Sequence, residues 1–434
     1  MPAKDRLLNG IAERDLKVVV LGIGYVGLPL VVAFAEAGFR ACGVDISSER
    51  VDSINRGQSY IEDIPTLAIK KLVEQGRLWA STDFAEIVDA DAIIICVPTP
   101  LRKTKDPDIT YIIDAADKIA EYGCKGKLVI LESTTYPGTT EEVVMPRLSS
   151  SNHVGQDYFL AFSPERIDPG RSDFVLANTP KVVGGVTDDC LEVAVSLYDT
   201  IVEETKPVSS TRAAEMVKLL ENTFRAVNIG LVNEVALICD KLDLDVWEVV
   251  GAAATKPYGF MPFYPGPGLG GHCIPIDPHY LSWKLRGMNF TARFIELASE
   301  INGSMPQYVT NKVAGALNQH AKPLKGSKIV ILGVAYKPNV SDIRESPALD
   351  VIHLLNKQGA EIYFHDPFVR DLEDAEVPAQ AVELTAENLN DADCVVVITN
   401  HEGYDWRWVT DQSRLIVDTR NALHGLDNEH IVRL

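Results

Sequence analysis

Lys17-Val-Val-Val-Leu-Gly-Ile-Gly-Tyr-Val-Gly27 is the stretch of sequence that decides the fold. It begins with a short apolar run, places glycines at positions 22, 24 and 27, and continues into an apolar stretch with the length of a helix. A second apolar run, residues 39–44, ends at Asp45. Strand, glycine turn, helix, strand and terminal carboxylate in this order are typical of the dinucleotide-binding unit of a Rossmann fold.

Each part of this turn has a chemical reason. Gly22 permits the sharp turn, Gly24 lets the backbone approach a pyrophosphate, and Gly27 allows the helix to pack closely on the strand. Asp45 would accept hydrogen bonds from ribose hydroxyls and would repel a 2'-phosphate, so NAD is favoured over NADP. The alternative is a glycine turn in an ordinary sheet, which leaves the strand-helix context and Asp45 unexplained.

The rest of the chain repeats this alternation. Apolar runs at 91–97 and 128–131 alternate with helical segments, as expected for a parallel, doubly wound sheet. The carboxyl third adds runs at 327–333, 360–367, 391–400 and 415–419. We therefore predict an α/β protein with two Rossmann-like doubly wound lobes. The second lobe has only Gly333, followed by Tyr336-Lys337-Pro338, so we expect it to bind something other than a dinucleotide.

A long central helix is predicted to join the lobes. Residues 207–211 carry a helix start signal, and no proline or glycine follows until Gly230. If the helix runs to about Asp240, its rise of ~1.5 Å per residue makes it roughly 45 Å long. Glu215 and Glu221 are expected at its surface. Apolar residues at spacings of three and four predict one buried face, formed by Ala213, Met216, Val217, Leu220, Phe224, Val227 and Leu231.

Composition argues against several classes of function. The formal net charge of -20 opposes binding to nucleic acid and to anionic membrane surfaces, which depends on Lys and Arg contacts to phosphates. The amino terminus lacks the apolar core of a secretory signal, and no run of about 18 apolar residues would span a membrane, so a cytoplasmic protein is expected. The seven cysteines form no CxxC pair, which argues against disulfides and against a metal site.

One cysteine stands apart from the others. Cys273 lies in the glycine-rich segment 264–277, beside His272 and four residues before Asp277. The usual role of a single cysteine is that of a small buried hydrophobe, which suits Cys42, Cys96, Cys239 and Cys394 in their apolar surroundings. The polar loop around Cys273 favours a nucleophile instead.

Polar residues on the central helix are candidates for stabilising charge. Lys218 and Asn222 are one turn apart, and Arg225 follows three residues later, so we expect all three on one polar stripe. Such a stripe is often only a solvated helix face. A Lys and an Asn together would also stabilise an alkoxide or a tetrahedral oxyanion.

A predicted strand ends at Leu131, at the edge of the sheet where ligands bind in open α/β folds. Ser133-Thr134-Thr135 would face a ligand there or would cap the next helix. The segment Phe162-Ser-Pro-Glu165-Arg166-Ile-Asp-Pro-Gly170 places a carboxylate and a guanidinium between prolines, as a surface ion pair or as part of a site. The residues alone leave both alternatives open.

Taken together, these segments resemble the UDP-glucose/GDP-mannose dehydrogenase family over nearly the whole chain. The corresponding motifs, in order, are GIGYVGLP, VPTP, the Glu-Ser-Thr run, SPERIDPG, KLLENTFR, GLGGHCIPIDP and AYKPNVSDIRESP. The resemblance implies residues 1–206 as the NAD-binding domain, 207–305 as the central helical domain with the cysteine loop, and 306–434 as the UDP-sugar-binding domain. Independently of the resemblance, a long central helix often forms a dimer interface, so a homodimer or higher homo-oligomer is expected.

The resemblance further implies roles for individual residues. The catalytic group would be Cys273, Lys218, Asn222, Asp277, Glu165 and Thr134. NAD would be bound by Gly22, Gly24, Tyr25, Val26, Gly27, Asp45, Arg50, Pro98, Thr99, Ser133, Thr134 and Arg344, with Arg420 nearby. The UDP-sugar would meet Glu165, Arg166, Lys218, Asn222, Arg225, Phe263, Tyr264, Gly270, Cys273 and Lys337.

The expected reaction is the four-electron oxidation of a sugar carbon-6 alcohol to a uronic acid. Because one NAD accepts two electrons, Cys273 would hold the aldehyde as a thiohemiacetal until a second NAD oxidises it to a thioester, which water near Glu165 and Thr134 hydrolyses. Asp277 would orient Lys218 or a water. The loop SPERIDPG is similar to the N-acetylhexosamine branch of the family, and residues 255–266 look most like UDP-N-acetylglucosamine 6-dehydrogenases.

Several alternatives remain at this point. UDP-N-acetylmannosamine or UDP-glucose are other candidate substrates. A two-electron hydroxyacid or sugar-phosphate dehydrogenase would share the two lobes and the Lys/Asn pair, although it leaves Cys273 unexplained. A non-enzymatic NAD-binding scaffold would use the acidic surface for partners.

Overall fold

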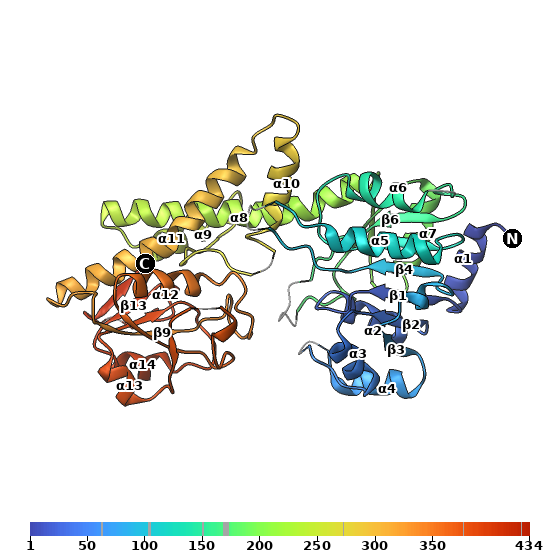
Figure 1. The fold of residues 1–434 in the computed structure, drawn as a ribbon. Helices are drawn as coiled ribbons and strands as arrows, with labels where there is room; N and C mark the ends of the chain where they lie inside the picture. Colours follow the sequence, from blue (N-terminus) through green and yellow to red (C-terminus); the bar gives the residue numbers. More distant parts are fainter. Residues whose placement is uncertain are drawn as a thin grey trace. The chain divides into compact units, whose positions relative to one another are not determined.

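The computed structural model describes residues 1–61, 64–102, 106–149, 152–167, 173–271, 273–375, 377–426 and 428–434. The chain forms two compact units. The first comprises residues 1–221 and 279–290, and the second comprises residues 222–278 and 291–434. Each unit is an α/β lobe built on its own sheet, as predicted (Figure 1).

The sheet of the first unit has eight strands in the order β3-β2-β1-β4-β5-β6-β7-β8. Its strands are β1 (Lys17–Leu21), β2 (Arg40–Val44), β3 (Leu78–Ser81), β4 (Ala92–Ile95), β5 (Leu128–Leu131), β6 (Phe159–Phe162), β7 (Lys181–Gly185) and β8 (Thr205–Val208). All neighbouring pairs are parallel except β6 and β7, which are antiparallel. The first residue of β7 therefore lies at the edge where β4, β5 and β6 end.

Helices cover both faces of this sheet, which explains why the strands are continuous apolar runs. One buried cluster joins the sheet to α1 (Ala3–Glu13), α2 (Gly27–Glu36), α3 (Ser48–Asn55), α4 (Thr66–Glu74) and α7 (Asp188–Tyr198). The cluster on the other face includes η1 (Phe84–Ile87), α5 (Thr110–Tyr122), η2 (Thr140–Val144) and α6 (Met145–Leu148). Val18 and Val19 show the alternation, since consecutive side chains enter opposite clusters.

The sheet of the second unit has six parallel strands in the order β11-β10-β9-β12-β13-β14. They are β9 (Lys328–Leu332), β10 (Glu361–His365), β11 (Gln380–Ala381), β12 (Cys394–Val397), β13 (Ile416–Asp418) and β14 (Ile431–Arg433). Helices α11 (Arg293–Gln319) and α12 (Pro347–Lys357) pack on one face, and α13 (Ala386–Asp391) and α14 (Trp406–Gln412) pack on the other. The predicted second lobe is confirmed.

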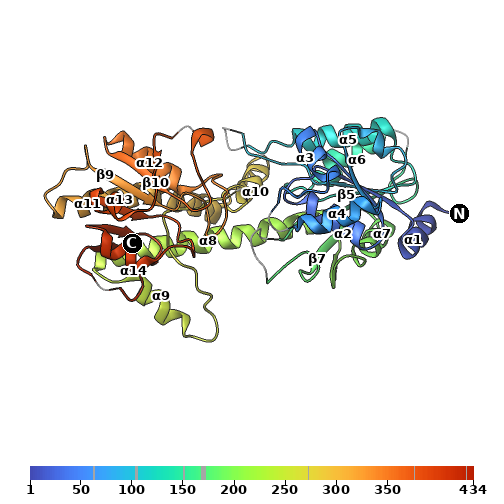
Figure 2. The ribbon, with the colours of Figure 1, turned by 90° about the horizontal axis from the view of Figure 1, so that it is seen from below.

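Helix α8 (Thr211–Leu242) is the predicted long helix, continuous over 32 residues, or about 48 Å at ~1.5 Å per residue (Figure 2). Ser210 caps its start, because the Ser210 hydroxyl accepts a hydrogen bond from the Ala213 N–H at 3.2 Å. The helix ends where Asp243 adopts a left-handed φ of 54°. Within the second unit, Gly230 lets α11 approach closely, since a Cβ there would lie 3.1 Å from Ala298.

The predicted buried face of α8 is wrong for three of its seven residues, whereas Val217 packs against a buried cluster of the first unit. Leu220, Phe224 and Leu231 are 57%, 46% and 58% exposed. Most of the side chains of α8 that are buried are small or polar. The buried residues are Thr211, Ala214, Glu215, Lys218, Leu219, Asn222, Ala226, Val232, Asn233, Ala236 and Cys239. Small residues permit close packing, and the buried polar ones have hydrogen-bond partners, so the face in contact with the protein is not the most apolar one.

Two shorter helices complete the chain. Asp245 caps α9 (Val246–Ala254) by accepting a hydrogen bond from the Trp247 N–H at 2.7 Å. Helix α10 (Asp277–Arg286) follows the cysteine loop. Among the helices of the described residues, none is both long and apolar enough to cross a membrane.

Candidate active site

The glycine turn after β1 has the form that a dinucleotide requires. Gly22 has a φ of 88°, and a Cβ on Gly27 would lie 1.9 Å from the Gly22 carbonyl oxygen. Gly24 differs, because a Cβ there would meet nothing within 4 Å. Tyr25 is half exposed, and Val26 directly precedes α2. The backbone therefore leaves open space at Gly24, beside a helix N-terminus that favours a phosphate, and these residues fit NAD.

Asp45 lies at the end of β2, as predicted, and is already tied to the turn. Its carboxylate accepts hydrogen bonds from the backbone N–H groups of Ile23 (3.0 Å) and Ser47 (2.9 Å). The Arg50 guanidinium lies 3.3 Å away. The Tyr60 hydroxyl donates to the Ile23 carbonyl, a contact that sequence reasoning missed because Tyr60 lies 37 residues from Ile23.

Residues after β4 and β5 lie at the same sheet edge. The Ser133 hydroxyl donates to the Val97 carbonyl at 2.7 Å, so it joins the ends of these two strands. Thr134 is partly exposed beside it, and Pro98 is exposed. The Thr99 carbonyl accepts a hydrogen bond from the Tyr280 hydroxyl at 2.5 Å.

The loop after β6 is not a simple surface ion pair. Glu165 is buried, and its Oε1 accepts hydrogen bonds from the backbone N–H groups of Arg166 (2.7 Å) and Ile167 (2.6 Å). The Arg166 guanidinium instead contacts Glu221 (2.6 Å) and the Pro180 carbonyl (2.6 Å). The rest of the expected motif, residues 168–170, lies outside the described residues.

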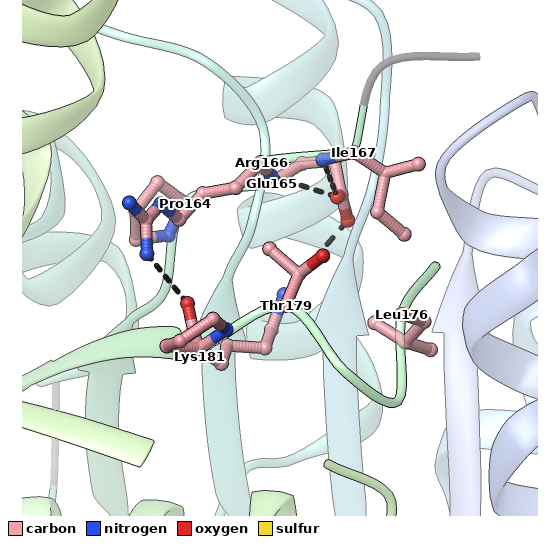
Figure 3. A pocket seen from close by; sticks show the side chains of 8 residues that line it. Pro164, Glu165, Arg166, Ile167, Leu176, Thr179 and Lys181 are labelled. Atoms are coloured by element: carbon pink, nitrogen blue, oxygen red, sulfur yellow. Dashed lines mark hydrogen bonds and ion pairs between the residues drawn. The ribbon is translucent and has the colours of Figure 1, made fainter. Parts of the chain in front are cut away.

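Figure 3 shows this loop facing the segment before β7. Residues 164–167 and 179–181, together with Leu176, line a small pocket. The Thr179 side chain points toward the Glu165 carboxylate, whereas the Arg166 side chain points away from it (Figure 3). The Glu165 carboxylate therefore faces the backbone of its own loop and the segment before β7.

A buried ionic cluster at this edge was not foreseen. Lys181, the first residue of β7, forms an ion pair with Glu132, and its Nζ lies 3.8 Å from Oε2 of Glu165. The Tyr198 hydroxyl donates to Glu132 at 2.5 Å. Lys181 and Glu132 each lie at the end of an apolar strand. That position could have predicted a buried ion pair, because an ionisable residue is rarely buried without a partner.

The helix residues Lys218 and Asn222 are both buried, and each has a partner. Lys218 Nζ donates to the main-chain carbonyl of Glu165 at 2.7 Å. The Asn222 amide donates to the Asp277 carboxylate. Asp277 thus binds Asn222, and its expected role in orienting Lys218 or a water stays a prediction. Helix α8 places Arg225 on the same side as Lys218 and Asn222, as predicted, but Arg225 is exposed whereas these two residues are buried.

Glu215 corrects another expectation. It was predicted at the surface, yet it is 0% exposed. One carboxylate oxygen accepts from the Gly138 N–H at 2.5 Å, and the other accepts from the N–H (2.9 Å) and the hydroxyl (2.7 Å) of Thr140. Burial raises the pKa of Glu215 to about 7, although these three donors oppose the rise.

The cysteine loop is fastened to the second unit by its glycines. The Gly271 N–H donates to the Arg344 carbonyl at 3.0 Å, and a Cβ on Gly270 or Gly271 would lie 2.8 Å from Tyr336. The Gly266 N–H donates to Asn233 on α8 at 3.0 Å. Only glycine allows such close approach, so the loop is held against the segment that carries Lys337.

Cys273 is partly exposed, while the other six cysteines are buried, as predicted for Cys42, Cys96, Cys239 and Cys394. Its carbonyl accepts hydrogen bonds from the N–H groups of Ile276 (3.0 Å) and Asp277 (2.8 Å), which form the turn into α10. His272, its predicted neighbour, lies outside the described residues.

The remaining expected ligand contacts belong to the second unit. Lys337 Nζ lies over the ring of Tyr336 at 5.6 Å, and the Arg344 guanidinium forms an ion pair with Asp342 at 2.6 Å. Phe263 packs edge-on against Phe224, and Tyr264 stacks on Trp247. Arg420 is partly exposed and lies beside Gly266, where a Cβ would lie 2.4 Å from the guanidinium.

The fold and the glycine turn define the class of protein: an α/β dehydrogenase with one dinucleotide-binding lobe and a second lobe that lacks the turn. Comparison with known families makes the assignment specific. The NAD-binding, central and UDP-binding domains of the UDP-glucose/GDP-mannose dehydrogenase family match residues 16–202, 212–304 and 330–425. The chain belongs to this family. It is an NAD-dependent nucleotide-sugar dehydrogenase, which confirms the predicted cofactor and sets aside a non-enzymatic scaffold.

Individual relatives cover almost the whole chain. The UDP-N-acetyl-D-mannosamine dehydrogenase of Methanococcus maripaludis strain C7 is 35% identical, with 94% of each chain covered. The NDP-N-acetyl-D-galactosaminuronic acid dehydrogenase of Ralstonia nicotianae is 37% identical over 94% of this chain and 96% of that protein. The solved UDP-D-ManNAc dehydrogenase of Pyrococcus horikoshii has a TM-score of 0.87 at 33% identity and covers 96% of this chain and 98% of its own.

Proposed function

We propose that this protein oxidises the carbon-6 alcohol of a UDP-N-acetylhexosamine to the uronic acid, with UDP-N-acetylglucosamine as the preferred sugar. The observation that carries the proposal is the contrast between Cys273 and the other cysteines. Cys273 alone is accessible, in a glycine loop fastened beside Lys337, whereas the other six are buried. A dehydrogenase that stopped at the aldehyde would have no need of this thiol.

The proposed roles follow from the chemistry. Residues 1–206 would bind NAD, which accepts one hydride in each of two oxidations. Residues 306–434 would bind the UDP-sugar, with Lys337 at its phosphates. The thiol in the central domain, residues 207–305, would trap the aldehyde and later carry the acyl group, so that the substrate is retained between the oxidations.

Other residues would manage charge and water. Lys218 and Asn222, already held by the Glu165 carbonyl and by Asp277, would stabilise the successive oxyanions. Glu165 and Thr134 would hold the water that hydrolyses the thioester. Both helix side chains are fixed by partners before any substrate arrives, which reduces the reorganisation needed during the reaction.

The choice of sugar rests on two observations that point differently. Residues 255–266 look most like UDP-N-acetylglucosamine enzymes, which supports that substrate. The relatives from Methanococcus maripaludis and Pyrococcus horikoshii carry the name of UDP-N-acetylmannosamine, which makes that sugar the second candidate. Both belong to the N-acetylhexosamine branch indicated by the loop at 162–170.

Turnover with three substrates tests the proposal. NADH formation would be measured with UDP-N-acetylglucosamine, UDP-N-acetylmannosamine and UDP-glucose under matched conditions, and the sugar product would be identified. We expect the highest kcat/KM with UDP-N-acetylglucosamine and two NADH per sugar. One NADH per sugar with an aldehyde product would contradict the four-electron reaction, and a preference for UDP-glucose would contradict the branch assignment.

The central helix also supports a proposed homodimer. Phe224, Leu231, Ile238 and Leu242 are exposed on α8 within the second unit, at spacings of seven, seven and four residues. Large apolar side chains that recur along one helix face are typical of a surface that another helix covers.

A further inference from the structure

Lys181 is a buried cation that lies close to two carboxylates and to the ring of Tyr198. It lies at the first position of β7, and the antiparallel direction of β7 brings it to the edge where β5 and β6 end. Glu132 follows β5 and Glu165 follows β6, so both carboxylates face the same ammonium group. The three residues are separated by up to 49 positions in the sequence and meet only because of this strand order.

The groups around Lys181 come from four further elements of the first unit. Glu132 and Glu165 supply the carboxylates, Tyr198 comes from α7, and Cys96 follows β4. Burial alone would lower the pKa of Lys181, but the charges of Glu132 and Glu165 outweigh it and raise the pKa. Burial also raises the pKa of Tyr198 and of Cys96, so both stay protonated. Two carboxylates therefore share a single buried cation.

Glu165 occupies a central position in this arrangement. Its Oε1 is held by two backbone N–H groups, and its Oε2 faces Lys181 at 3.8 Å. Its main-chain carbonyl accepts the hydrogen bond from Lys218 at 2.7 Å. A change in the position of Glu165 would consequently disturb both its own carboxylate and the Lys218 ammonium group.

We propose that Lys181, held in place by Glu132 and Tyr198, is a positioning residue that orients Glu165 and balances its charge for hydrolysis of the Cys273 thioester. This inference rests on the proposed function. In the hydrolysis, the water oxygen bonds to the acyl carbon, the carbon–sulfur bond breaks, Cys273 leaves as a thiolate, and the water proton passes to Glu165. Lys181 touches none of the reacting atoms and acts through the charge of Glu165.

The other explanation is that the cluster only stabilises the fold. A structural ion pair would lower stability when removed, without shifting the pH dependence of one chemical step. The two explanations differ in the effect they predict when a charge near Glu165 is removed, because removal of a carboxylate and removal of the ammonium group should have opposite effects. Replacing Glu132 leaves Lys181 to Glu165 alone and favours the ionised carboxylate, whereas removing Lys181 as well takes this support away.

The experiment compares Glu132→Gln with the double variant Glu132→Gln/Lys181→Met in the full-length enzyme with NAD and the UDP-N-acetylhexosamine. The two variants differ only at position 181, and neither leaves an unpaired carboxylate at position 132. Rapid mixing measures the burst of NADH and the steady-state rate between about pH 5 and about pH 9, and mass spectrometry after acid quenching measures the acyl adduct on Cys273. Lys127→Met is the matched control, because Lys127 is also a buried lysine beside a strand, bonded to the carbonyls of Ile87 and Val88.

We expect the acid limb of the steady-state rate to lie at least about one pH unit higher in the double variant than in Glu132→Gln. Below that limb the rate falls about tenfold per unit, while the burst amplitude and the KM for NAD stay unchanged and the Cys273 adduct accumulates. Lys127→Met should leave the limb in place. Coincident pH profiles for the two Glu132 variants would overturn the inference.

Two further outcomes can be distinguished from failure of the inference about Lys181. If the double variant does not fold, Glu132→Gln alone still decides, because its acid limb should lie below that of the wild type; an unchanged or higher limb overturns the inference. If the wild type itself forms no acyl adduct on Cys273, the proposed function fails first, and the role of Lys181 fails with it.

Discussion

Glu215 connects helix α8 to the segment that follows β5. Its carboxylate accepts three hydrogen bonds from Gly138 and Thr140, and it lies one turn before Lys218. This buried acid therefore fixes the register between the helix that carries Lys218 and the loop that carries Thr134. Its burial has a consequence for stability.

The pKa of Glu215 is raised from 4.5 to about 7, chiefly by burial. Because the folded value is the higher one, the folded state binds more protons than the unfolded state between these two values. The contribution of this carboxyl group to stability is therefore full below about pH 4.5 and is lost as the pH rises through about 7. We expect the free energy of unfolding of the wild type to fall relative to Glu215→Gln by on the order of 3 kcal/mol between about pH 4 and about pH 8.

Denaturant unfolding of both proteins across this range measures the difference. Glu203→Gln, at an exposed position, is the control and should track the wild type at every pH. A constant difference between wild type and Glu215→Gln would show that Glu215 does not titrate in this range.

Cys273 is the second residue with a direct test. Cys273→Ala should lower formation of the uronic acid by at least about a thousandfold, because the aldehyde has no covalent anchor. Binding of NAD, measured by fluorescence titration, should change little, since Cys273 lies outside the glycine turn. Cys239→Ala removes a buried thiol and should keep two NADH per sugar. Wild-type turnover by Cys273→Ala would rule out covalent trapping.

At the scale of elements, the glycines in the turn between β1 and α2 have different roles: Gly27 is required for the fold, and Gly24 is expected to make room for the ligand. A Cβ on Gly27 would collide with backbone at 1.9 Å, whereas a Cβ on Gly24 would meet nothing within 4 Å of the protein. The open position is the one where a pyrophosphate is expected to approach.

Gly24→Ala and Gly27→Ala should therefore fail in different ways. Gly24→Ala should change stability by less than about 0.5 kcal/mol but weaken NAD binding at least about tenfold. Gly27→Ala should lower the melting temperature of the free protein, because the first turn of α2 must move. Calorimetry of the free and NAD-bound proteins distinguishes the two. Unchanged NAD affinity in Gly24→Ala would place the dinucleotide elsewhere.

Helix α8 shows that the spacing of apolar residues predicts a helix but does not always predict which face of it is buried. Its length and start were predictable from the absence of helix breakers and from Ser210. Its inward face was not, because apolar residues at helical spacing suit a core and a second protein surface equally. Ala226 and Ala236 face inward because small side chains allow close packing, and Leu231 is left outside.

At the scale of the whole molecule, the exposed stripe on α8 predicts the state of assembly. Leu231→Glu should convert a homodimer into a monomer of 47.6 kDa, because a charge in an apolar interface is costly to bury. Light scattering after size exclusion measures the mass. Val88→Glu is a matched control, since Val88 is 59% exposed and Leu231 is 58% exposed. Equal masses for Leu231→Glu and wild type would move the interface elsewhere.

Much of the candidate site was readable in advance because its parts are local. The glycine turn, Asp45 after β2 and the loop around Cys273 each lie in a short segment whose chemistry depends on its own residues. The pairing of Lys218 with the Glu165 carbonyl, and of Asn222 with Asp277, joins residues 53 and 55 positions apart. Helical spacing placed both on α8 but gave no information about what they meet.

The sequence by itself determined the two-lobe α/β plan, the preference for NAD and the singular position of Cys273, because backbone conformation and strand alternation are properties of neighbouring residues. Only the tertiary structure decided that Lys181 joins Glu132 to Glu165, that Glu215 is buried, and that the apolar stripe of α8 faces outward. These contacts depend on strand order, on the antiparallel direction of β7 and on the rotation of a helix about its axis. All three are set by packing across the whole lobe, which no short segment encodes.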